Sequence, residues 1–327
     1  MTIDKTQNCY IMYVVRWRIA AFSRNSATYA SGSVVSAEFS EKRGVFLFTS
    51  ILKEHKGFGK QIILLAKNEL IKTYKGAVIG PLWAAVKPAF TVFVYWFAFS
   101  VGIKALKAVK VHLNGMENAA FSLDFFTFMF IGIIPWFFIQ DSIIQGAKTL
   151  RTNRQFITKV KFPVSTILTY TGLSRLFVHL FLCLFLYAYV IFYRVSNGNP
   201  PFDWYDLQFF FYCPLLFYFF LALSWSTAPM SAFSKDFESL IVSIMSGVFW
   251  LSGIMYDSYS FTGGLKWAML INPINFFANG YRNTFLYHRG FWVYKTELLI
   301  FAVELIGVTL LGIFNYNRLR KKLPDVL

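Results

Sequence analysis

Long apolar segments are the feature that most constrains how this chain can fold. A helix needs about 20 apolar residues to cross a hydrocarbon layer of about 30 Å. We expect six such transmembrane helices, at about residues 82–103, 125–147, 166–193, 207–228, 240–256 and 298–316. The chain is 56% hydrophobic and 15% charged, which is more apolar surface than one soluble core can bury. The sequence therefore predicts an all-α integral membrane protein and excludes a disordered, collagen-like or disulfide-rich class.

The positive charge is distributed unevenly along the chain. Lys and Arg number 32 against 16 Asp and Glu, a net charge of +16. If the N-terminus is cytoplasmic, 22 of the 32 basic residues fall on the cytoplasmic side and 8 on the outer side. Cytoplasmic loops of membrane proteins are enriched in Lys and Arg, so both termini are expected in the cytoplasm and no nucleic-acid partner is implied. Lys104, Lys107 and Lys110 fit this orientation poorly.

Residues 1–50 differ from the rest and are rich in Ser and Arg. The apolar stretch Cys9–Val15 is cut by Arg16 and Arg18, so it is too short and too charged for the core of a signal peptide. We interpret 1–50 as a cytoplasmic extension and 51–327 as the transmembrane domain.

Residues 60–75 have the pattern of an amphipathic helix. Ile62, Leu65, Ala66, Leu70 and Tyr74 recur at three- and four-residue spacing, opposite a mostly basic face. Such a helix ahead of the first span is typical of one lying in the cytoplasmic membrane interface. The alternative is a soluble helix packed on a partner.

The cytoplasmic loop 148–165 reads KTLRTNRQFITKVKFPVS. It predicts a short helix that ends before Pro163, because the residue preceding proline avoids helical geometry. Phe156, Ile157 and Val160 would form an apolar patch among basic residues. An ordinary positive loop would explain the charges but not these apolar side chains, so the patch indicates a partner.

The outer segment 257–296 contains the apolar run Leu265–Ile271 followed by Asn272-Pro273. The run is too short to span but suits a re-entrant helical hairpin, which persists only when protein or a water-filled cavity surrounds it. The alternative is an interfacial loop anchored by Trp267 and Tyr281.

Catalytic patterns are weak. Gly57-Phe58-Gly59-Lys60 lacks the first Gly and the final Ser or Thr of a phosphate-binding loop, so this chain is not expected to hydrolyse ATP. No metal-ligand spacing occurs among His or Cys residues. Four charged residues lie within spans, namely Lys87, Asp141, Arg175 and Glu304. We expect Lys87 and Asp141 to extend toward the interface, while Arg175 and Glu304 are candidates for a pair.

Four stretches together resemble the membrane subunits of ABC-2 exporters of lipid-linked cell-surface polymers. They are TYKGAVIGPLWAAVKPAF (73–90), VYWFAFSVGIK (94–104), the segment 132–165 with GIIPWFFIQDSIIQGAKTL and ITKVKFPVS, and INPINFFANGYR (271–282). The resemblance is greatest to teichoic acid export permeases of the bacterial cytoplasmic membrane, with O-antigen and capsule permeases next. It covers about residues 50–320 and implies the ABC-2 (type V exporter) fold, including an interface helix, a coupling helix and a re-entrant hairpin.

The resemblance also implies partners. The chain would be half of a homodimer that binds two copies of an ABC ATPase, with ATP and Mg²⁺ on that subunit and no cofactor on this chain. The coupling helix would span 151–162. Its expected ATPase contacts are Arg151, Asn153, Arg154, Phe156, Lys161, Phe162 and Pro163.

The substrate implied by the resemblance is a glycan polymer on a polyprenyl pyrophosphate carrier, within the membrane lipids. Aromatic rings can stack on sugars, and the candidates for the path are Tyr95, Trp96, Phe99, Trp136, Phe249 and Trp250. Basic side chains near the cytoplasmic entrance, Lys72, Lys75 and Lys87, are candidates for attracting the pyrophosphate.

Two other function classes remain open from the sequence. A secondary carrier working alone would favour an inverted repeat across the two halves, which the sequence does not display. A membrane-bound transferase would need acidic or histidine clusters at the interface. Asp203 and Asp206 are the candidate pair, and they are better explained as the start of a helix.

Overall fold

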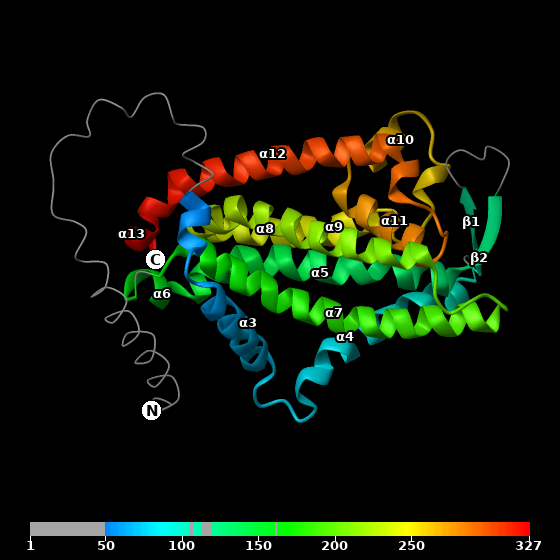
Figure 1. Cartoon of the computed structure of the whole chain (residues 1–327), viewed down its shortest axis with the longest axis horizontal. Coiled ribbons are helices and arrows are strands. Elements are labelled where there is room, and N and C mark those ends of the chain that lie inside the picture. The colour runs from blue at the N-terminus through cyan, green and yellow to red at the C-terminus, as the bar shows by residue number, and fades with distance from the viewer. Residues whose placement is uncertain (1–49, 105–106, 113–119, 161) are drawn as a thin grey trace.

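A computed structural model describes residues 50–104, 107–112, 120–160 and 162–327, so the predicted extension 1–50 lies almost entirely outside the described residues. The described chain is mostly helical. Five of its helical segments are long and apolar enough to cross a membrane, and they lie lengthwise in one bundle (Figure 1). They are Gly80–Gly102, Phe125–Thr152, Val164–Ser196, Trp204–Phe233 and Lys295–Val326.

These segments contain the elements η2 (Gly80–Leu82), α4 (Trp83–Trp96), η3 (Phe97–Gly102), α5 (Phe125–Thr152), α7 (Val164–Ser196), η4 (Trp204–Gln208), α8 (Phe209–Phe233), α12 (Lys295–Leu319), η7 (Arg320–Lys322) and α13 (Leu323–Val326). The centre of the bundle is α5, which packs on α7 and α8. Asp124 caps α5 by accepting a hydrogen bond from the Thr127 amide (3.2 Å). By contrast, α4 is largely uncovered, as expected of a helix that faces lipid or another protein.

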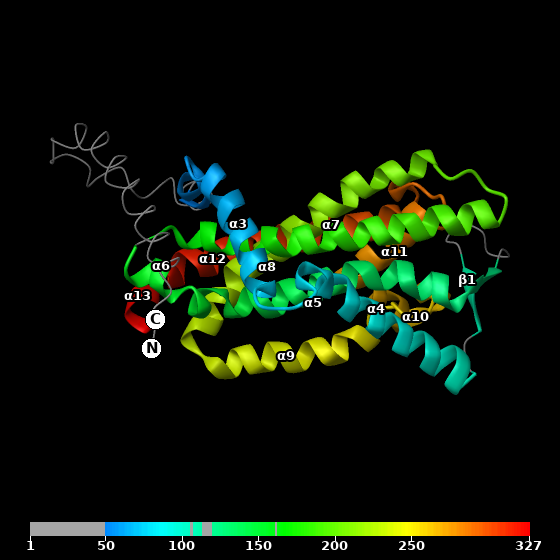
Figure 2. The same ribbon diagram turned by 90° about the horizontal axis from the view of Figure 1, so that it is seen from below.

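The fifth predicted span, 240–256, is short for a crossing helix, and the observed helix both begins and ends earlier in the chain. Helix α9 covers Lys235–Trp250, 16 residues, and an α-helix of that length is about 24 Å long, less than the hydrocarbon thickness. It nonetheless runs beside α5 and α8 (Figure 2). Five described segments therefore meet the length requirement, and the six-span topology stays a prediction.

The packing of α8 against α12 gives a matched test of this bundle. A Cβ on Gly312 would overlap the carbonyl oxygen of Ala222 in α8, whereas no described atom lies within 4 Å of a Cβ on Gly307. We expect Gly312→Ala to lower the free energy of unfolding by about 1–3 kcal/mol because the helices must separate. Gly307→Ala should leave it unchanged or higher, since Ala favours helix over Gly by about 1 kcal/mol. Thermal unfolding in detergent checks both, and equal effects would contradict this packing.

A small β-hairpin lies at the end of the bundle where α5 begins, so the prediction of an all-α chain was wrong in this respect. Strand β1 (Ala108–His112) pairs antiparallel with β2 (Ala120–Asp124). The Oδ2 atom of Asp257 accepts from the His112 amide (2.8 Å) and lies 3.0 Å from its Nδ1, which fixes the hairpin to the loop after α9. Lys110 belongs to β1, and Lys104 and Lys107 precede it. The three lysines that fit the predicted membrane orientation poorly therefore lie in or just before this hairpin.

The predicted re-entrant segment forms η5 (Ser258–Ser260), α10 (Gly263–Leu270), α11 (Pro273–Phe285) and η6 (Phe291–Val293). Every residue of α11 from Ile274 to Phe285 is buried, and α11 packs on α5 at the same end as the hairpin (Figure 1). Tyr281 is buried and shares a 2.7 Å hydrogen bond with His179 of α7, so it does not anchor an interfacial loop. Whether this segment dips into the membrane stays a prediction.

The opposite end carries α3 (Gly59–Tyr74) and α6 (Arg154–Thr158), with α13 packed against α6. Ile62 and Ala66 of α3 are buried against the bundle, whereas Ile63 and Ile71 are exposed, as suits a helix in a membrane interface. The predicted coupling range 151–162 was too long at its start, because α5 continues to Thr152.

Glu54 joins three parts of this end. Its Oε2 accepts from the Ser165 amide (3.2 Å) and hydroxyl (2.6 Å) and from the Tyr316 hydroxyl (2.5 Å). Its Oε1 forms an ion pair with Arg320. The helical stretch 50–55 is thereby tied to the start of α7 and the end of α12.

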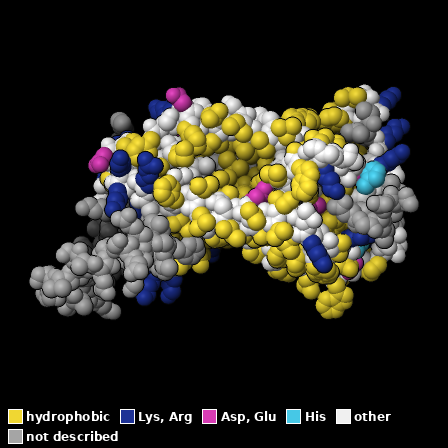
Figure 3. Space-filling view, turned by 90° about the horizontal axis from the view of Figure 1, so that it is seen from above, with side chains coloured by type: hydrophobic (Ala, Val, Ile, Leu, Met, Phe, Trp, Pro, Cys, Tyr) yellow, Lys and Arg dark blue, Asp and Glu magenta, His cyan; other side chains and the backbone are white. Residues whose placement is uncertain are grey.

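Side chains on the surface are segregated along the bundle. On the face in Figure 3, hydrophobic side chains cover the middle, while Lys and Arg lie mainly toward the two ends. Such an apolar belt between charged ends is typical of a protein embedded in a bilayer.

The Asp203 and Asp206 pair starts a helix, as predicted, because the two side chains form a capping box on η4.

Candidate functional site

A polar cleft of 570 Å³ opens in the part of the bundle nearest α3. We call it the head cleft. The end of α3, the first turns of α4, and α5 and α7 enclose it. Its polar side chains are Thr73, Tyr74, Lys87, Gln140, Asp141, Gln145, Arg175 and His179. Burial raises the pKa of Tyr74, so its phenol is a neutral hydrogen-bond donor.

Arg175 is the most enclosed cation in the head cleft. Its side chain is 10% exposed, and Nη1 lies 3.3 Å from Oδ2 of Asp141. Its buried Nε has no hydrogen-bond partner among the described residues. The candidate pair of Arg175 with Glu304 does not form, because Arg175 pairs with Asp141. That Asp141 extends toward the membrane interface stays a prediction.

A second, apolar hollow of 850 Å³ continues from the head cleft. We call it the trough. Pro88, Phe137 and Leu182 line both spaces. The remaining lining of the trough is Ala85, Val86, Ala89, Val92, Phe93, Trp96, Asp124, Phe126, Phe130, Ile134 and Phe185. Together the two spaces form one groove that is charged at one end and apolar at the other.

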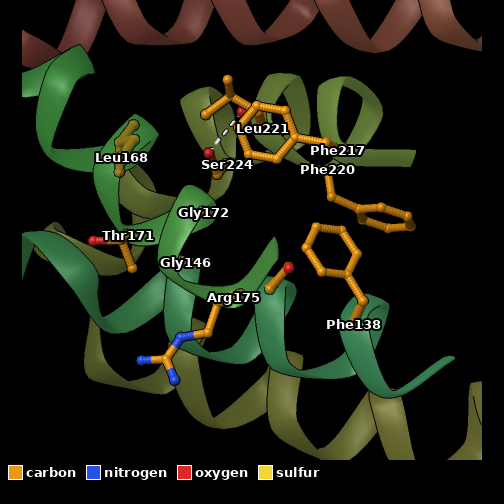
Figure 4. Close-up of a pocket in the computed structure, with 11 residues that line it drawn as sticks. Phe138, Gly146, Leu168, Thr171, Gly172, Arg175, Phe217, Phe220, Leu221 and Ser224 are labelled. Carbon is orange, nitrogen blue, oxygen red and sulfur yellow. Dashed lines mark hydrogen bonds between the residues drawn. The ribbon is translucent and has the colours of Figure 1, made fainter. Parts of the chain in front are cut away.

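A cavity of only 20 Å³ lies beside Arg175, between α5, α7 and α8. Figure 4 shows the guanidinium of Arg175 turned away from the rings of Phe138 and Phe220 that border this cavity. Ser224 lies on its rim with its hydroxyl donating to the carbonyl of Leu221 (2.6 Å). The cavity is large enough for one water molecule and too small for a substrate.

Five of the six aromatic residues predicted for the substrate path pack on one another. The ring of Phe249 lies 5.2 Å from that of Tyr95 and 5.3 Å from that of Trp136, and Trp250 contacts Tyr95 and Phe99. Trp136 and Phe249 are 3% and 5% exposed. The sixth, Trp96, lines the trough.

Of the three basic residues predicted to attract the pyrophosphate, one lies in the head cleft and two lie on or at the end of α3. Lys87 lines the head cleft. Lys72 is exposed and lies 4.0 Å from Glu69 on α3, and Lys75 caps the end of that helix.

The predicted ATPase contacts around α6 also divide into two groups. Arg151 forms an ion pair with Glu238 (3.1 Å) and donates to the Ser231 carbonyl, so it connects α5 to α8 and α9. Asn153 and Phe162 are buried, Pro163 is half-buried, and the ring of Phe156 lies 5.9 Å from that of Phe162. Arg154 is exposed, and Lys161 lies outside the described residues.

Arg282 lies in the motif INPINFFANGYR, and the structure gives it a role that the sequence analysis did not predict. It is 0% exposed and donates to the carbonyl oxygens of Phe128 (3.2 Å), Gly253 (2.9 Å) and Ile254 (2.6 Å). The guanidinium also lies 3.6 Å from the ring centre of Phe128. Burial lowers its pKa to about 10, so it remains charged at neutral pH.

A comparison with known protein families places these features in one of them. A family model described as ABC-2 type transporter matches residues 60–286. The chain belongs to the ABC-2 type transporter family. This ABC-2 chain is 24% identical over 233 residues to the O-antigen export system permease protein RfbA of Myxococcus xanthus, covering 70% of this chain and 81% of the relative. It is 22% identical over 278 residues to RfbA of Klebsiella pneumoniae, covering 84% of this chain and 98% of the relative.

The family assignment agrees with the resemblance seen in the sequence and with a multi-pass membrane protein. The match includes α3, the groove, α6 and α11. Within the described ranges, no three His, Cys, Asp or Glu side chains come together as a metal site.

Proposed function

We propose that this ABC-2 chain is the permease subunit of an ATP-driven exporter that moves a cell-surface polysaccharide across the bacterial inner membrane. The observation that carries the proposal is the match over nearly the whole length of an O-antigen export permease. A multi-helix bundle with an apolar belt and a cleft lined by Lys87, Asp141 and Arg175 supports a transport role.

The motor in this proposal is a separate ATPase that holds ATP and Mg²⁺. Two copies of this chain pair with each other and each binds one ATPase copy. The exposed face of α6, with Arg154, Gln155 and Lys159, is the proposed contact, since Arg151 and Phe162 are engaged within the chain. The C-terminus is then cytoplasmic, because α13 packs against α6, and the N-terminus is proposed to lie on the same side.

The polymer is proposed to be an O-antigen-type polysaccharide on a polyprenyl pyrophosphate carrier. The names of the relatives favour it over teichoic acid, which was the first expectation from the sequence. The two polymers differ chemically, because teichoic acid has alditol phosphate repeats and an O-antigen has sugar repeats. Analysis of the polymer retained inside cells that lack this chain distinguishes them.

Co-purification and export in the same cells test the function. We expect the tagged chain to co-purify with an ABC ATPase, and surface polysaccharide to disappear when either subunit is deleted. Inactivating the phosphate-binding loop of the ATPase should stop export while leaving the complex intact. Export that persists without the ATPase would instead identify a secondary carrier.

A further inference from the structure

We propose that the head cleft and the trough together form a binding site for a single lipid with a diphosphate head. The diphosphate lies between Arg175 and Lys87, and the hydrocarbon tail lies in the trough along α4. The choice of a polyprenyl diphosphate among anionic lipids rests on the proposed function, whereas the site itself rests on the geometry of the groove.

The charges of the head cleft favour an anion. Arg175 and Lys87 are positive and Asp141 is negative, so the charged side chains lining the cleft carry one excess positive charge. Arg175 is nine-tenths buried and has an unpaired Nε, although a buried guanidinium is stable only when its charge and its N–H groups are satisfied. A phosphate group satisfies both, because its oxygens match the planar fork of N–H donors.

Neutral donors surround the same space. Gln140 and Gln145 of α5 and Tyr74 of α3 line it, so further phosphate oxygens have partners. Both α3 and α5 therefore contribute neutral donors to the head cleft.

The trough has the properties required for a tail. Its lining is apolar except for Asp124, whose side chain caps α5 at the far rim. Between Ala85 and Trp96, α4 rises by about 16 Å, close to half the hydrocarbon thickness of about 30 Å. The trough therefore accommodates a tail within roughly one leaflet.

The order of the two spaces fixes the direction of the lipid. The head cleft lies beside the end of α3, whereas the trough runs toward β2 at the other end of the bundle. A lipid bound this way has its head on the side of α6 and its tail toward the membrane centre, the orientation of a lipid in the cytoplasmic leaflet.

Asp141 gives the proposal a directional test. Its carboxylate occupies Nη1 of Arg175 and competes with a phosphate for it. Removing this carboxylate should therefore tighten lipid binding, and removing the guanidinium should weaken it.

The experiment measures binding of a fluorescent polyprenyl diphosphate to the full-length chain in nanodiscs. We expect Arg175→Gln to weaken binding at least about tenfold and Arg175→Lys to weaken it less. Asp141→Asn should strengthen binding. Ala89→Phe, which fills the trough, should weaken lipid binding. Lys266→Gln removes one exposed charge at the outer end and is the matched control.

Three further ligands separate the parts of the site. The polyprenyl alcohol of equal length lacks the diphosphate and so measures what the head contributes to binding. Inorganic pyrophosphate lacks the hydrocarbon chain and so measures what the tail contributes. Phosphatidylglycerol vesicles measure selectivity among anionic lipids. Each should compete at least about tenfold less well than the polyprenyl diphosphate. Equal competition by any of them, or unchanged binding in Arg175→Gln, would overturn the proposal.

Failure of this site and failure of the proposed function have different signatures. ATPase-dependent export together with normal lipid binding by Arg175→Gln would reject the site alone. Selective diphosphate binding by a chain that exports without an ATPase would reject the function alone. If Arg175→Gln does not fold, Arg175→Lys and Ala89→Phe still decide the matter.

Discussion

Reversing two charges on α6, with Arg154→Glu and Lys159→Glu together, is expected to release the ATPase and abolish export. Both side chains are exposed on or directly after this short helix. Because neither takes part in the buried packing around Ile157 and Phe162, the fold should be unaffected. Like charges placed across an interface cost several kcal/mol, so the ATPase should bind at least about tenfold more weakly.

The matched control places the same two changes at the other end of the bundle. Lys266 and Lys295 are exposed near the outer segment, and their substitution by Glu alters net charge equally. Co-purification from detergent measures ATPase binding, and surface labelling measures export. A full ATPase yield with Arg154→Glu and Lys159→Glu would remove α6 from the interface.

Arg282→Met is expected to have the largest effect on stability. The substitution removes a side-chain donor from the carbonyl oxygens of Phe128, Gly253 and Ile254. The Phe128 carbonyl keeps its partner within α5, whereas Gly253 and Ile254 lie outside helices. Each unpaired group costs about 1–3 kcal/mol, so a loss of at least about 2 kcal/mol is expected. The outer segment should then detach from α5.

The control and a second variant keep this prediction sharp. Arg318→Met removes an exposed arginine from α12 and should leave thermal unfolding nearly unchanged. Gly132→Ala should destabilise as Arg282→Met does, because its Cβ would overlap the guanidinium. Equal unfolding temperatures for Arg282→Met and the parent would show that these hydrogen bonds contribute little.

The helical part of the fold could be predicted because apolar length alone specifies a spanning helix. The end of helix α9 was mispredicted, because the apolar run continues to Tyr256 whereas the helix ends at Trp250. The β-hairpin was missed because its partner strands are separated by intervening residues. Alternation of the apolar Val109 and Val111 with the polar Lys110 and His112 was the available signal.

The partner of Arg175 could have been found from the chain itself. Asp141 lies 11 residues before the end of α5, and Arg175 lies 11 residues after the start of α7. Two antiparallel helices joined by a short connection place such positions at the same height. The aromatic path residues could not be sorted this way, because α4 and α5 are apolar on several faces and the sequence does not say which face meets α9.

The contacts of Glu54 bear on where the smallest stable unit of this chain begins. The family match starts at residue 60, and a shortened chain beginning at Gly59 would retain every long helix. It would nevertheless lose the carboxylate that accepts from Ser165 and Tyr316 and pairs with Arg320. The boundary of the folding unit therefore lies upstream of the boundary of recognisable family sequence.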